Sequence, residues 1–392
     1  MTVVIGVPQK GRTGIGALEA LSRAGLLDSN IASGIGQIHQ QEKQRIKQEA
    51  KSGHYSTTKD MLYYLRDHPL AEYLHLQSDT GRQGYPPRIV FNMAESESSE
   101  GIPLLIKGLN HYTAPQELRS HEADIIFGGW DEIYASLVDE IQERAKNIGK
   151  WLKFNSYVGK ERRHWNDDVV VKGYKRTDAE IAGSAGLGDF VGHWLIFPED
   201  KIQELSDENG NVCLKNVDRI YIDPKFAAVY NAVLSTQSYP YTCSSLFGEK
   251  QVLFEKGQEV ELISAEDVED AVIENNGVGI EIVQTASTLR KKHLVMAGYP
   301  LVESETVIAH IGQANLGEDG NKILSRLNPL DYESPERVDA YNQWYKTLSS
   351  NSGDNWLAKP DPYPMFFNQQ VTVYKIFTGE RQTEFEKKIR AQ

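Results

Sequence analysis

The chain has 392 residues, of which 40% are apolar and 25% charged, and its formal net charge is −13. This length is sufficient for two lobes with a core in each, and the excess of acid argues against a broad surface for nucleic acid or anionic membrane. No stretch approaches membrane-spanning length and no signal-peptide pattern follows Met1, so we expect a cytoplasmic protein without membrane or nucleic-acid partners. Two cysteines, Cys213 and Cys243, predict no disulfide framework.

Short apolar runs alternate with longer stretches of helical pattern along the whole chain. This alternation favours an α/β fold over an all-α or all-β one. Residues 36–52, rich in Gln, Lys and Glu, predict a solvated helix. The runs that predict strands are 3–7, 88–91, 103–107, 124–127, 168–171, 194–197, 219–222, 251–254, 278–283 and 306–309.

A turn with two cations follows the first predicted strand, and it consists of Lys10, Gly11 and Arg12. In an α/β sheet, ligands gather beyond the carboxyl ends of the strands. Arginine binds phosphate oxygens by a forked contact and lysine acts as a point charge, so this turn is a candidate site for a pyrophosphate or triphosphate. The alternative is a solvated turn with ordinary surface charges.

A second turn, residues 128–131, follows the strand predicted at 124–127. Glycine lets a backbone or a ligand approach closely, which makes this turn, with Gly129 and Asp131, a candidate place for a ligand. Asp131 also suits the N-cap of a helix predicted at 132–145, and both interpretations stay open.

A third turn lies in the segment 281–289. A mostly apolar run leads into a hydroxyl-rich turn, and a basic, helix-like segment follows. This arrangement points several backbone N–H groups at one place, and a helix N-terminus favours anions. The hydroxyls of Thr285, Ser287 and Thr288 add donors, so the turn is a candidate phosphate site. An ordinary strand-to-helix loop with a Ser or Thr cap is the alternative.

The third turn resembles the phosphate loop of the ATP phosphoribosyltransferases, the first enzymes of histidine synthesis. That loop reads Asp-hydrophobic-hydrophobic-x-Thr-Gly-x-Thr-Leu, and Thr285, Thr288 and Leu289 match it. Glu281 stands where the family has Asp, and Ala286 stands where it has Gly. If the turn needs a positive φ at this position, Ala286 carries strain that glycine avoids.

Other stretches resemble the same family in the same order. Residues 3–12 are similar to its opening strand and Lys-Gly-Arg turn, and residues 301–305 to its returning strand. Its Ala-Asp-Leu-Gly-Ile-x-Gly-x-Asp strand and turn are matched by Ala123, Asp124, Gly129 and Asp131.

The resemblance implies an α/β fold of two lobes, like a type II periplasmic binding protein, with a ligand cleft between them. We expect the first lobe at 1–145 and 296–392, where it contains the Lys-Gly-Arg turn and a C-terminal extension. The second lobe is expected at 146–295, where it contains the phosphate-binding turn.

The resemblance also implies a reaction. Ribose 5-phosphate would move from phosphoribosyl pyrophosphate, with Mg²⁺ as cofactor, to a nitrogen of ATP or another purine-like acceptor. Lys10 and Arg12 would be catalytic, stabilising the leaving or nucleotide phosphates. Substrate would be bound by Gly11, Gly129, Asp131, Glu281, Thr285, Ala286, Ser287 and Thr288. The ten histidines show no metal-ligand spacing, so no metal held by the protein is predicted.

Two alternatives remain because the stretches between the matched segments are longer than is usual in the family. The same donor would serve an acceptor of specialised metabolism, or the chain would be a non-catalytic regulatory protein that binds a small anion or nucleotide. A homo-oligomer is compatible with each interpretation.

Overall fold

The computed structural model describes most of the two halves of the chain. The strand predicted at 168–171 lies outside the described residues, as does most of the helix predicted at 132–145. The described residues are 2–77, 87–110, 114–133, 135, 155–157, 179–205, 212–214, 217–227, 230, 252–253, 260–331, 334–353, 356–357 and 370–372.

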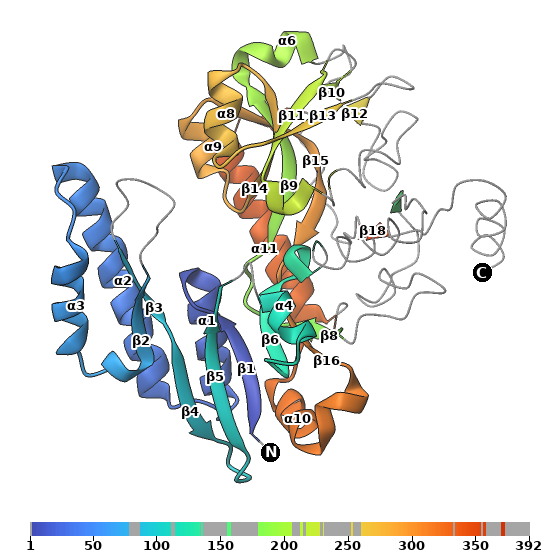
Figure 1. The fold of residues 1–392 in the computed structure, drawn as a ribbon. Coiled ribbons are helices and arrows are strands. Elements are labelled where there is room, and N and C mark those ends of the chain that lie inside the picture. Colours follow the sequence, from blue (N-terminus) through green and yellow to red (C-terminus); the bar gives the residue numbers. More distant parts are fainter. Residues whose placement is uncertain are drawn as a thin grey trace, which may run out of the picture. The chain divides into compact units, whose positions relative to one another are not determined.

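The chain forms two compact units. Unit 1 comprises Met1–Gly129, Thr177–Leu187 and Thr306–Asp331, and unit 2 comprises Trp130–Arg176, Gly188–Glu305 and Tyr332–Gln392. Each unit is built round a mixed sheet with helices (Figure 1). The predicted α/β class is therefore confirmed, and the chain divides into two units.

Unit 1 has a six-stranded sheet in the order β4-β5-β1-β6-β16-β8. The central strand β1 runs parallel to β5 and β6, while β16 runs antiparallel to β6 and β8. Strands in the middle of such a sheet are buried on both faces, which explains why they read as continuous apolar runs. The strands are β1 (Val3–Pro8), β4 (Met93–Glu97), β5 (Pro103–Leu109), β6 (Ile125–Gly129), β8 (Ala179–Ser184) and β16 (Thr306–Ile311).

Helices and a short hairpin complete unit 1. Helix α1 buries Ala17, Leu18 and Leu21 along one face, at the three- and four-residue spacing of an amphipathic helix. Figure 1 shows α2 and α3 beside the antiparallel pair β2 and β3. These elements are α1 (Gly11–Arg23), α2 (Ser29–Ser52), α3 (Thr58–Arg66), η1 (Ala71–Tyr73), β2 (Leu74–Gln77), β3 (Arg88–Phe91), α4 (Ala114–Arg119) and α10 (Gln313–Leu327).

Helix α2 confirms the helix predicted at 36–52 but corrects its surroundings. The Glu42 carboxylate is buried and accepts a hydrogen bond of 2.5 Å from the backbone N–H of Ile89 on β3. Arg45 donates to both carboxylate oxygens of Glu49 at 2.8 Å and to the carbonyl of Pro87 at 3.0 Å. This helix is therefore attached to β3 by charged groups, which a polar composition alone does not reveal.

Unit 2 has a second six-stranded sheet, in the order β13-β11-β14-β9-β15-β17. Strand β11 is parallel to β13 and β14, whereas β9 is antiparallel to β14 and β15. The strands are β9 (Val191–Pro198), β11 (Arg219–Ile222), β13 (Glu261–Ser264), β14 (Val278–Val283), β15 (Leu294–Ser304) and β17 (Trp356–Leu357).

The helices of unit 2 are mostly short, and two further strand pairs lie outside its main sheet. Strand β10 (Val212–Cys213) pairs with β12 (Val252–Leu253), and β7 (Asn155–Tyr157) pairs with β18 (Gln370–Thr372). The helices are η2 (Glu199–Lys201), α6 (Ile202–Leu205), η3 (Pro224–Phe226), α8 (Val268–Glu274), α9 (Ser287–Lys291) and α11 (Pro335–Ser352). Among the described residues, no helix is long and apolar enough to cross a membrane.

The lobe boundaries expected from the sequence stay a prediction, and the two units divide the chain at other positions. Strand β8 belongs to unit 1 and helix α11 to unit 2, whereas we expected them in the second and first lobes respectively. Each unit is described by itself, so the cleft expected between the lobes also stays a prediction.

Leu18→Ala should test the packing of α1 on its sheet. Leu18 is 1% exposed, so we expect a loss of about 2–5 kcal/mol in the free energy of unfolding from lost burial and the cavity left behind. The neighbouring Glu19 is exposed, and Glu19→Ala should change that free energy by less than about 0.5 kcal/mol. Chemical denaturation measures both, and equal effects would contradict the packing described.

Candidate functional site

The hydroxyl-rich turn lies between β14 and α9 in unit 2. Ala286 occupies the N-cap position of α9 with φ 55° and ψ 6°, which is the left-handed conformation. Such values are uncommon for a residue with a Cβ, and they carry strain. The sequence left open whether this position has a positive φ. It does, and the methyl group of Ala286 is buried.

The turn places its hydroxyl groups close together. Thr285 Oγ1 lies 3.2 Å from Ser287 Oγ, Thr285 is half-buried, and Ser287 and Thr288 are exposed. No side chain caps α9, which is only five residues long. A left-handed residue next to right-handed ones turns consecutive N–H groups toward one point and forms a concavity for anions. Any anion affinity here therefore comes from the turn and its hydroxyls more than from a helix dipole.

Glu281 lies on β14, opposite Trp194 on β9. Its Oε1 accepts a hydrogen bond of 2.9 Å from the backbone N–H of Ile282, which favours the charged form. Burial outweighs this bond and raises the pKa of Glu281 to about 8, helped by the negative charges of Glu269, Asp267 and Asp223. Glu281 is consequently protonated near neutral pH in the ligand-free protein.

Asp131 belongs to a buried hydrogen-bonded network within unit 2. Its Oδ2 lies 2.9 Å from His193 Nε2 on β9, and its Oδ1 accepts from Ser304 Oγ on β15 at 2.5 Å. His193 Nδ1 lies 2.7 Å from the hydroxyl of Tyr230. All four residues are buried, so the network replaces water for every one of them.

One arrangement of protons satisfies each bond of this network. The Asp131 N–H donates to Ser304 Oγ at 3.0 Å, which leaves the Ser304 proton for the Asp131 carboxylate. His193 then donates from Nε2 to Asp131, and Nδ1 accepts from Tyr230. Burial strongly raises the pKa of Tyr230, which keeps its hydroxyl proton in place. Burial pushes the pKa of Asp131 upward, but the bonds to His193 and Ser304 hold it below its usual value.

This network changes the interpretation of the second turn. Trp130 is already helical, and the Asp131 carboxylate is bonded to His193 and Ser304 instead of capping the helix. Gly129 ends β6, where it pairs with Thr306 of β16. Roles for Gly129 and Asp131 in binding substrate stay predictions.

The sequence interpretation missed His193, Tyr230 and Ser304. One signal was available for His193, because it is a lone polar side chain in the apolar run that forms β9, and a buried polar group needs a partner. Its partners come from segments distant in the chain, and no spacing pattern connects them.

The turn of Lys10, Gly11 and Arg12 begins α1 in unit 1. Lys10 is extended, and its Nζ lies 3.5 Å from Gln77 Oε1 on β2. Gly11 has φ +82°, in the left-handed region, so an alanine here would be strained although there is space for its methyl group. Arg12 is exposed. The turn therefore has a glycine at a position where the backbone conformation favours one.

A crevice in unit 1 opens beside this turn. Lys10 and Gly11 line it together with His39 of α2 and apolar residues that include Ile38, Leu74 and Phe91. Burial and the positive charges of Lys43 and Arg88 lower the pKa of His39. The charged form of His39 is therefore disfavoured in this mostly apolar crevice.

The structure thus gathers the predicted residues into separate groups. Residues 285–288 share one turn, and Glu281 lies on β14, the strand that leads into this turn. Lys10, Gly11 and Arg12 share a turn in unit 1. That both turns face one ligand stays a prediction.

Glu281→Gln should stabilise the protein in a pH-dependent way. The pKa of Glu281 rises from 4.5 in the unfolded chain to about 8, so the folded state holds this proton more tightly. In the wild type, the contribution of Glu281 to the free energy of unfolding is fully present below pH 4.5 and is lost as the pH rises toward 8. Glutamine has no such proton, so the stability gain of the variant should grow over this window, to on the order of 1–3 kcal/mol at pH 8.

Thermal unfolding at pH 5, 6.5 and 8 measures this difference. Glu274→Gln, on the exposed end of α8, serves as the control and should show a difference that does not change with pH. A difference for Glu281→Gln that is equally constant would contradict the raised pKa.

Comparison with known proteins gives the context of these groups. A family model described as halobacterial ATP phosphoribosyltransferase matches residues 1–335. No curated protein matches the chain in sequence. Similar solved structures include the ATP phosphoribosyl transferase (HisG:HisZ) complex from Thermotoga maritima, with 12% identity, coverage of 87% of this chain and 100% of that chain, and a TM-score of 0.37.

Amino-acid-binding proteins also appear among the similar structures. The GluR0 ligand-binding core in complex with L-glutamate has 9% identity, covers 63% of this chain and 83% of its own, and has a TM-score of 0.32. An ancestral arginine-binding protein bound to arginine has 9% identity, coverage of 62% and 81%, and a TM-score of 0.32. The family match extends over residues 1–335 of the 392, and the chain therefore belongs to the halobacterial ATP phosphoribosyltransferase family, a family of pentosyltransferases of histidine biosynthesis.

Proposed function

We propose that this chain transfers ribose 5-phosphate from phosphoribosyl pyrophosphate to a nitrogen of ATP. The observation that carries the proposal is the left-handed conformation of Ala286, at the position where the resembled phosphate loop has glycine. A strained conformation at such a turn persists where it serves a function and the surroundings enforce it. This conformation supports a turn that keeps the shape of the phosphate loop without its glycine.

The donor would bind to unit 2 through its 5-phosphate. Backbone N–H groups of the turn and the hydroxyls of Thr285, Ser287 and Thr288 supply the donors that its oxygens need. Glu281 would bond the ribose hydroxyls from β14. Because its carboxyl is protonated near neutrality, it can both donate to one hydroxyl and accept from another.

In the proposed reaction, a nitrogen lone pair of the acceptor forms a bond to the anomeric carbon of the ribose. The bond from that carbon to the pyrophosphate oxygen breaks, and pyrophosphate leaves with the electron pair. Negative charge grows on the leaving group, so catalysis would consist mainly of positioning and electrostatic stabilisation. Lys10 and Arg12 would stabilise the phosphates of the leaving group or of the nucleotide, with Gly11 allowing their close approach.

Mg²⁺ would enter as part of the donor substrate, bound to pyrophosphate oxygens. Magnesium keeps several water ligands and commonly binds substrate phosphates with few protein groups. Among the described residues, no three His, Cys, Asp or Glu side chains gather closely enough to hold a metal ion. Gly129 and Asp131 would border the acceptor, with Asp131 held by His193 and Ser304.

The decisive experiment incubates the protein with phosphoribosyl pyrophosphate, MgCl₂ and ATP. We expect pyrophosphate and a phosphoribosyl-nucleotide adduct in equal amounts, measured by a coupled assay and mass spectrometry. Lys10→Ala should lower kcat by on the order of 10²-fold, because a positioned charge at the departing phosphates is lost. Lys59→Ala, an exposed lysine on α3 of the same unit, should retain wild-type rates.

The alternatives give different outcomes in the same assay. An adduct with another base or nucleotide in place of ATP would indicate a specialised acceptor. Donor binding without pyrophosphate release for any acceptor would support a regulatory protein. Wild-type turnover in Lys10→Ala would remove Lys10 from the catalytic residues.

Ala286→Gly should bind the donor at least as tightly as the wild type. Glycine adopts the left-handed conformation without the Cβ penalty and relieves about 1 kcal/mol of strain. The loss of a buried methyl group, about 0.8 kcal/mol, and the greater unfolded-state entropy of glycine offset this gain, so overall stability should change little. Calorimetric titration with phosphoribosyl pyrophosphate and thermal unfolding measure both. Markedly weaker binding would show that the turn is not a phosphate cradle.

A further inference from the structure

Helix α11 packs against the phosphate turn, although it lies beyond the family match at residues 1–335 apart from its first residue. The indole N–H of Trp344 donates a hydrogen bond of 2.9 Å to the backbone carbonyl of Gln284. Gln284 directly precedes Thr285, so this bond holds the point where β14 enters the turn.

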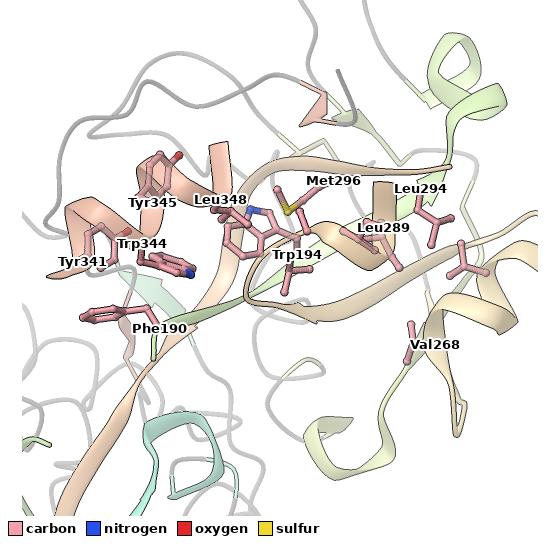
Figure 2. Packing of buried hydrophobic residues seen from close by; sticks show 14 residues of the cluster. Phe190, Trp194, Val268, Leu289, Leu294, Met296, Tyr341, Trp344, Tyr345 and Leu348 are labelled. Carbon is pink, nitrogen blue, oxygen red and sulfur yellow. The ribbon is translucent and has the colours of Figure 1, made fainter. Parts of the chain in front are cut away.

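The large buried side chains of α11 are Tyr341, Trp344, Tyr345 and Leu348, at positions i, i+3, i+4 and i+7 of one face. Figure 2 shows these side chains in one cluster with Phe190, Trp194 and Leu289. Trp344 has ring contacts to Tyr341 at 5.3 Å, to Phe190 at 5.8 Å and to Trp194 at 6.1 Å. The ring of Trp344 is therefore fixed on several sides.

The start of α11 is also held firmly. Ser334 Oγ caps it by accepting from the Arg337 N–H at 3.3 Å, and Pro335 occupies the first turn. Arg337 forms a largely buried ion pair with Glu305 at the end of β15, and its guanidinium lies 5.5 Å from the centre of the Phe190 ring. The helix cannot shift without breaking these contacts, so the position of Trp344 is set by the fold of unit 2.

The turn needs such support. A left-handed residue with a Cβ costs about 1–2 kcal/mol and persists only where its surroundings determine it. Helix α9 is short and has no side-chain cap, and Ala286 and Leu289 pack into the same cluster as Trp344. The cluster fixes the turn from Ala286 onward, and the Trp344 bond fixes it from Gln284.

We propose that Trp344 is a positioning residue for the donor phosphate, and that α11 is the element of this chain that preorganises the phosphate turn. This inference rests on the proposed function. A preorganised turn does not have to be ordered by the ligand, so loss of the bond to Gln284 should weaken donor binding. The acceptor and the chemical step should depend on it little.

Trp344→Phe removes the N–H and keeps an aromatic ring. We expect the Kd for phosphoribosyl pyrophosphate with MgCl₂ to rise about five-fold, which corresponds to the loss of one ordinary hydrogen bond. In the enzyme assay the KM of the donor should rise similarly, with kcat and the KM of ATP unchanged. A second variant serves if phenylalanine disturbs folding. It carries benzothienylalanine at position 344, which replaces the N–H by sulfur in a ring of the same shape, and its Kd for the donor should rise by the same factor.

Leu205→Ala is the control for stability. Leu205 on α6 of unit 2 is 1% exposed and is not part of the cluster around Trp344, so its truncation should lower the melting temperature more than Trp344→Phe while leaving donor affinity near wild type. Unchanged affinity in Trp344→Phe and the benzothienyl variant would overturn this role, and so would affinity losses that simply follow the melting temperature across the three variants. A wild-type protein that binds no donor would instead overturn the proposed function itself, and this role with it.

Discussion

The backbone conformation of Ala286 is the constraint on which the candidate site depends. A positive φ at a residue with a methyl group is unfavourable, yet a left-handed residue at such a turn is the conformation that turns successive N–H groups toward one point. The strain is offset within unit 2, because the methyl group of Ala286 and the side chain of Leu289 are buried in the hydrophobic cluster that contains Trp344. Burial of Ala286 would thereby stabilise a left-handed conformation that the glycine of the resembled loop can adopt without a Cβ penalty.

The fold was accessible from the sequence where a single element is decided by local pattern. Strands such as β1, β14 and β16 are mostly apolar, and the apolar runs in the sequence nearly coincide with the observed strands. Strand β8 and the end of β15 contain glycine and polar residues, and pairing with neighbours decides their structure. Local pattern is silent there because the stabilising bonds come from other segments.

The residues of the candidate site also divide into those that the local sequence indicates and those that the fold brings together from distant segments. Thr285, Ser287 and Thr288 lie within a few residues of one another, so their order alone indicated a common turn. The partners of Asp131 are 62 and 173 residues away along the chain, and no spacing rule connects such residues. Trp344 is a further case, because the sequence does not distinguish it from the other aromatic residues. The fold brings its indole to the carbonyl of Gln284.

The raised pKa of Glu281 would couple ligand binding to the protonation of this carboxyl group. A carboxyl with a pKa of about 8 gives up its proton when a neighbouring cation favours the ionised form, and keeps it when a bound anion does not. Entry of a magnesium-bearing donor would therefore be accompanied by proton release or uptake. The heat of binding would then vary with the ionisation enthalpy of the buffer, and the sign of that variation would reveal whether the ribose or the cation controls this carboxyl group.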